Sequence, residues 1–158
     1  MIHKYTFRKQ IGARGLYASI IFDVSVDYGK ENSLQFDFQA DAIWKTACEA
    51  GVLIFFDYFK RMKQGRLMIT VTEIKWNPVD TNQLIIIFAT LKGLCEALDL
   101  NLEHLNLDEF SETFRFPECR TLLTKTKNPL DFTPRGFLLS NINQYYFTET
   151  ISIITVLL

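Results

Sequence analysis

Apolar and polar residues alternate through most of the first forty positions, a pattern typical of β-strands. Strands are predicted at Ile2–Arg8 and at Tyr17–Asp27, where one face is apolar and the other is mostly polar. A third strand would place Leu34, Phe36 and Phe38 on one face. Because only a short turn separates the second and third strands, we expect them to form an antiparallel hairpin.

From Asp41 the apolar residues recur every three or four positions, which predicts a helix of about five turns. Asp41 is suited to cap its N-terminus, and Gly65 is suited to end it. Gly51 lies inside this helix, where glycine costs roughly 1 kcal/mol relative to alanine. We therefore expect Gly51 to allow a close approach between the helix and the sheet, with a kink in the helix as the alternative.

A fourth strand is predicted at Leu67–Trp76, with a bulge near Thr72 because the apolar residues change phase there. A second helix follows, with Asp80 as its expected N-cap and an apolar stripe that continues to Leu98. This order of elements indicates an α+β fold: a sheet of about four strands with two helices on one face. The third and fourth strands would be joined by a β-α-β crossover.

The pattern weakens after Asn101, so we predict one α+β domain at residues 1–100 and a C-terminal extension at 101–158. Within the extension, Leu102 to Phe110 fits a short helix or an irregular turn. Ile151 to Leu158 is an apolar, β-prone run that would need to be covered. Such a run would add a strand or pack on the first domain.

Composition restricts the classes of function. The chain has 158 residues, is 48% apolar and carries 17 basic and 18 acidic residues, so no global charge attracts it to nucleic acid or lipid. It has no apolar run of membrane-spanning length, and its N-terminus lacks the apolar core of a signal peptide. Three widely spaced cysteines, Cys48, Cys95 and Cys119, favour buried thiols over disulfides. We expect a cytoplasmic protein without membrane contact.

Residues with catalytic chemistry are scattered along the chain. His3 and His104 lie far apart in sequence and near no cysteine pair, so no metal site is predicted. No glycine-rich nucleotide-binding motif is present, Cys48 is best interpreted as a packed thiol, and Asp80 is explained by capping. The sequence therefore predicts no catalytic residue and no cofactor, and the protein is not expected to be an enzyme.

The segment from Arg8 to Gly15 is the best candidate for a binding site. It places three positive charges beside Gly12 and Gly15. Glycines let the backbone approach a phosphate, and Lys9 and Arg14 could bind that phosphate. The same composition also fits a solvated hairpin turn, which the residues alone favour.

Two segments resemble a known family. Lys9-Gln10-Ile11-Gly12-Ala13-Arg14-Gly15-Leu16-Tyr17 resembles the KQsGGrGqY loop that opens the fourth domain of translation elongation factor G and its relatives. Val79-Asp80-Thr81-Asn82 resembles the family's VDSS before the last helix. The resemblance spans residues 2–98, with Ala13 and Leu16 replacing a family glycine and glutamine. It implies that Lys9, Gly12, Arg14 and Gly15 are RNA-binding tip residues.

In that family the domain contacts tRNA and ribosomal RNA, while another domain hydrolyses GTP. Our preferred hypothesis is a stand-alone, non-enzymatic module that binds ribosomal RNA, tRNA or the ribosome through this tip. The alternative is a protein-interaction or structural domain that kept the fold, with the extension contacting a partner or a second copy. A third, weaker hypothesis is an enzyme, because related folds include kinases of small metabolites.

Overall fold

The computed structural model describes residues 1–117, which lie within a compact unit running from Met1 to Thr121. The α+β architecture is confirmed, with a four-stranded sheet, two α-helices and a small additional hairpin. Its elements are β1 (Ile2–Ile11), β2 (Arg14–Asp27), β3 (Ser33–Phe38), the short 3-10 turn η1 (Ala42–Trp44), α1 (Lys45–Met62), β4 (Arg66–Lys75), α2 (Gln83–Ala97), β5 (Asn106–Asp108) and β6 (Thr113–Arg115). The predictions for Cys119 and for Ile151 to Leu158 fall outside the described residues.

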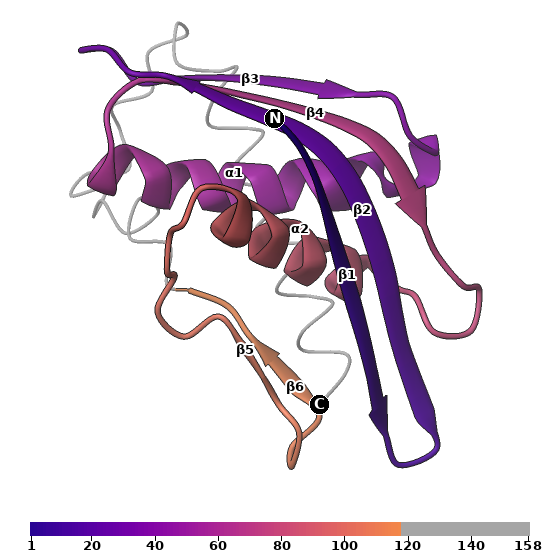
Figure 1. The fold of residues 1–158 in the computed structure, drawn as a ribbon. Helices are drawn as coiled ribbons and strands as arrows, with labels where there is room; N and C mark the ends of the chain where they lie inside the picture. Colours follow the sequence, from indigo (N-terminus) through magenta and orange to yellow (C-terminus); the bar gives the residue numbers. More distant parts are fainter. Residues whose placement is uncertain (118–158) are drawn as a thin grey trace, which may run out of the picture. The chain divides into compact units, whose positions relative to one another are not determined.

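The sheet has the strand order β1-β2-β4-β3 (Figure 1). β2 is antiparallel to both β1 and β4, whereas β3 is parallel to β4. The expected β-α-β crossover is therefore present, with α1 joining β3 to β4. The expected antiparallel hairpin of the second and third strands is wrong, because β4 lies between them.

Gly65, just before β4, allows this strand to enter the sheet between β2 and β3. A Cβ on Gly65 would lie 2.4 Å from the carbonyl oxygen of Asp27, the last residue of β2. Its backbone N–H donates to the Asn32 side chain at 3.0 Å, and its carbonyl accepts from Ser33 N at 3.4 Å. With φ at +145°, a conformation open to glycine, Gly65 fills the narrow space between the end of β2 and the start of β3.

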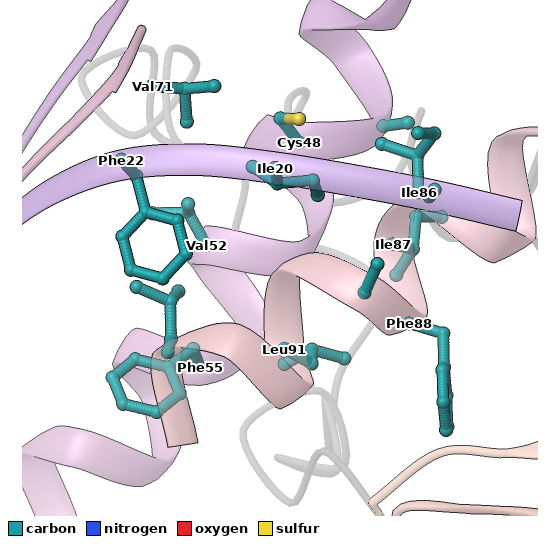
Figure 2. Close-up of a cluster of buried hydrophobic side chains, with 14 of the residues drawn as sticks. Ile20, Phe22, Cys48, Val52, Phe55, Val71, Ile86, Ile87, Phe88 and Leu91 are labelled. Carbon is teal, nitrogen blue, oxygen red and sulfur yellow. The ribbon is translucent and has the colours of Figure 1, made fainter. Parts of the chain in front are cut away.

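Both helices lie on one face of the sheet, as predicted (Figure 1). The residues of β2 that face them, among them Ala18, Ile20 and Phe22, are at most 1% exposed. Figure 2 shows Phe22 near Val52 and Phe55 of α1, so the strand and the helix share one core. This packing fixes the body of the domain through the removal of apolar surface from water.

The glycine inside α1 has a different neighbour from the one expected. A Cβ on Gly51 would lie 3.0 Å from Thr90 Cβ and 3.1 Å from the Ile87 carbonyl oxygen, both in α2. Gly51 therefore brings the two helices together, and the expected helix–sheet approach at this position is wrong. The approach between helix and sheet occurs instead at Gly93 of α2, where a Cβ would lie 2.9 Å from both Phe22 and Tyr5.

The bulge expected near Thr72 is confirmed, because the β2–β4 register shifts from Ile21 opposite Glu73 to Phe22 opposite Val71. The extra residue restores the alternation, so Ile74 is again buried. Two thiols are also buried as expected, and burial raises the pKa of Cys48 to about 12 and that of Cys95 to about 11. In residues 1–117 no helix has the length and apolarity needed to cross a membrane.

The predicted short helix after Asn101 is wrong, because residues 103–104 form a turn and a β-hairpin follows. β5 and β6 are antiparallel, and Phe114 of β6 contacts Phe88 of α2 with ring centroids 4.9 Å apart. Phe7 of β1 joins the same cluster, 5.2 Å from Phe88 and 6.1 Å from Phe114. Residues 101–117 thus share a core with the first hundred, and the compact unit extends beyond residue 100 to Thr121.

Candidate nucleic-acid interface

The β1–β2 hairpin ends in a two-residue turn, Gly12-Ala13, because the strands remain paired as far as Ile11 opposite Arg14. The observed loop is therefore shorter than the expected one, because Lys9 lies in β1 and Gly15 lies in β2. Gly12 has φ at +56° and Ala13 has no positive φ, a combination found in type II′ hairpin turns. Glycine at the first turn position and alanine at the second both suit this geometry.

The positive side chains of the tip differ in their surroundings. The Lys9 ammonium lies 2.5 Å from a carboxylate oxygen of Glu109, in the turn between β5 and β6. Arg8 and Arg14 are exposed, and within residues 1–117 neither forms an ion pair. Arg8 stands opposite Tyr17, and Arg14 immediately follows the turn. The Lys9 ammonium is therefore paired with a carboxylate, whereas Arg8 and Arg14 are exposed on opposite faces of the hairpin.

Gly15 lies against a carboxylate. A Cβ on Gly15 would lie 2.6 Å from one Asp80 oxygen and 2.7 Å from Asp80 Cγ. The missing side chain thus leaves room for Asp80, a contact that nothing in the sequence pattern indicates. The expectation that Asp80 caps α2 is wrong, because the cap is Asn82, whose side-chain oxygen accepts from Ile85 N at 3.0 Å.

Hydrogen bonds fix the loop between β4 and α2 to β2 near the tip. The backbone N–H of Tyr17 donates to the Asp80 carbonyl at 2.9 Å. The Thr81 hydroxyl donates to the Tyr17 carbonyl at 2.6 Å and accepts from Asn77 N at 2.9 Å. The two segments that resemble the family, one at each side of these bonds, are therefore in direct contact.

Residues that could hold a metal ion do not converge in the described part of the chain. Among residues 1–117 no group of three or more His, Cys, Asp or Glu is placed to hold a metal ion. His3 lies 3.9 Å from Glu96, and His104 is exposed with φ at +65° in the connection that leads to β5.

The comparisons with known proteins concern the fold. No family model matches the chain, and no curated protein matches it in sequence. Among solved structures, the chain is similar to a crystal structure of a protein from Thermus thermophilus, with 16% identity and a TM-score of 0.46. The similarity covers 60% of this chain and 15% of that chain, so the similar region is a small part of the Thermus protein.

Proposed function

We propose that this protein is a non-enzymatic RNA-binding module that contacts ribosomal RNA or tRNA through the tip of the β1–β2 hairpin. The observation that carries the proposal is the exposed Arg14, which directly follows the two-residue turn, together with the exposed Arg8, four residues before the turn on the other face of the hairpin. Guanidinium groups bind phosphate oxygens in a bidentate manner, and unpaired ones retain their full charge for this purpose. The whole chain has a formal net charge of −1, so it has no general attraction for RNA and binding would be confined to the tip.

The sequence resemblance to domain IV of elongation factor G supports the same proposal. The two segments that carry this resemblance meet where Gly15 contacts Asp80 and where the Thr81 hydroxyl donates a hydrogen bond to the Tyr17 carbonyl. This contact holds the tip hairpin at a fixed angle to the body of the domain. A hairpin fixed in this way can place its turn in a narrow RNA site without losing conformational entropy on binding.

Co-sedimentation with ribosomes across a salt series tests the proposal. We expect wild type to sediment with ribosomes at low salt, with affinity falling as salt rises because phosphate contacts release counterions. The double variant Arg8→Ala/Arg14→Ala should lose most of this binding. Lys9→Ala should have a smaller effect, because Glu109 already pairs with that ammonium.

Lys30→Ala is a matched control, because Lys30 is an exposed base in the turn after β2, at the other end of that strand. It should bind as wild type does. Absence of sedimentation at low salt by the wild-type protein would refute the proposed function. Equal loss in the control and in the double variant would show that charge anywhere on the surface suffices, and would refute the tip as the site.

A protein-interaction role is the second candidate, and a different surface favours it. Trp44 of η1 is buried and packs edge-on against Trp76, with ring centroids 5.5 Å apart. Ile43 beside it is 53% exposed and Trp76 is 37% exposed. Exposed apolar groups beside a buried aromatic are common in protein interfaces. Ile43→Ser should weaken capture of such a partner without changing ribosome sedimentation.

A further inference from the structure

The turn between β5 and β6 carries a phenylalanine whose side chain is completely exposed. Phe110 is 101% exposed, more than any other large apolar residue in the described part of the chain. Its sequence neighbours Glu109, Ser111 and Glu112 are exposed and polar. The ring is thus isolated, unlike the contiguous apolar patches at which proteins dock.

The backbone that presents Phe110 is held in place by Asp108. One oxygen of its carboxylate accepts from Phe110 N at 3.1 Å and from Ser111 N at 3.2 Å, while the other lies 2.8 Å from the Arg115 guanidinium. The Ser111 amide and then Arg115 hold the pKa of Asp108 below its usual value. The turn is therefore an ordered support for the ring.

The same turn lies beside the tip of the first hairpin. Glu109, which precedes Phe110, forms the 2.5 Å ion pair with Lys9 of β1. Phe114 anchors the base of the β5–β6 hairpin against Phe7 and Phe88. Figure 1 shows that the two hairpins point their turns toward the same end of the unit.

We propose that Phe110 stacks on an unpaired base of a single-stranded nucleic acid whose phosphates are bound by Arg14. The inference rests on the proposed function and adds a second hairpin to its site. Aromatic rings stack on any base, and this contact acts beside basic groups that bind the backbone. Asp108 and Glu109 are paired with cations, whereas Glu112 forms no ion pair within residues 1–117. Because its charge repels phosphate, the backbone would be bound at Arg14 and only a base would reach this turn.

Fluorescence anisotropy with a labelled oligouridine of about ten nucleotides tests the inference. Phe110→Ala should lower affinity by about 5- to 100-fold, the usual loss for one stacked base. Phe110→Trp should keep the wild-type affinity. Phe110→Leu should lose affinity as the alanine variant does, because leucine keeps apolar area but has no aromatic face. An abasic oligonucleotide of equal length should bind wild type and Phe110→Ala equally.

Tyr28→Ala provides a matched control, because Tyr28 is a 66% exposed aromatic residue just beyond the far end of β2. It should leave affinity unchanged. Equal affinity of Phe110→Ala and wild type, together with a loss in Arg14→Ala, would overturn the inference and leave the proposed function standing. No binding of the oligonucleotide by wild type at low salt would overturn this inference, and ribosome sedimentation in the same salt would decide whether the proposed function fails with it.

Discussion

Two glycines of this domain lie in opposite surroundings. A Cβ on Gly93 in α2 would lie 2.9 Å from atoms of Phe22 and Tyr5, whereas one on Gly12 at the hairpin tip would have no neighbour within 4 Å. Glycine at position 93 is required by the density of the core, and glycine at position 12 is required only by its positive φ. The body is therefore determined by packing, whereas within residues 1–117 no ion pair accounts for Arg8 and Arg14 of the hairpin.

The largest expected effect tests the packing of the body. Phe55 of α1 is fully buried and contacts Phe59 with ring centroids 6.5 Å apart. Phe55→Ala should lower the free energy of unfolding by about 3–5 kcal/mol, because it leaves a cavity that the core cannot close. Urea unfolding followed by circular dichroism measures this. A loss below about 1 kcal/mol would mean that the core is loosely packed.

Overpacking should be the next largest effect. Gly93→Ala places a methyl group against Phe22 and Tyr5, so we expect a loss of about 1–3 kcal/mol. The matched control is Gly29→Ala in the turn after β2, where a Cβ would meet no atom within 4 Å. The control should unfold as wild type does. Equal stability of both variants would remove the contrast between body and surface.

The buried thiol in α1 predicts a dependence on pH. Burial raises the pKa of Cys48 from 9.0 to about 12, so the folded protein keeps a proton that the unfolded chain releases. Stability from this group is complete below pH 9 and is lost as pH rises toward 12. The free energy of unfolding should therefore fall more steeply above pH 9 in wild type than in Cys48→Ala. Parallel profiles would contradict the assigned cause.

A smaller effect is expected where the tip joins the body. Gly15→Ala forces the Asp80 carboxylate away, and the coupling between the two positions should be about 0.5–1 kcal/mol. In an Asp80→Ala background, which lacks the obstructing atoms, the same glycine substitution should cost less. A double-mutant cycle in urea measures the coupling, and strict additivity would show that the contact has no energetic consequence.

The smallest effect on stability is expected at the tip itself. Arg14→Ala should change the free energy of unfolding by less than about 0.5 kcal/mol, because Arg14 is exposed and has no ion pair within residues 1–117. Its loss of RNA affinity should be large by comparison. A destabilisation similar to that of Gly93→Ala would instead give Arg14 a structural role and break the comparison.

The periodicity of apolar residues predicted those features of the fold that depend on neighbouring positions in the chain. The alternation in β2, the bulge at Thr72 and the helical stripe of α2 each follow from spacing along the chain, so they could be predicted. The pairing of β3 with β4 could not, because a short connection indicates only proximity. Which strands pair depends on elements that come later in the chain, and is therefore a property of the whole fold.

The candidate site was predicted only in part. Arg14 and Gly12 lie at the turn as the sequence suggested, because glycine chemistry is local. The pairing of Lys9 with Glu109 and the contact of Gly15 with Asp80 join residues far apart in the chain. No periodic pattern carries such information, and the same holds for Phe110, whose exposure depends on the hairpin around it.

The position of β4 between β2 and β3 has a consequence for synthesis of the chain. β3 leaves the ribosome before its partner strand, since among residues 1–117 it pairs only with β4, which is made after α1. Until Arg66 to Lys75 has emerged, the nascent chain exposes an unpaired β3 and one open edge of β2. A chain interrupted before Gly65 would therefore expose unpaired edges on both β2 and β3. Chains with such edges are bound by chaperones and aggregate readily.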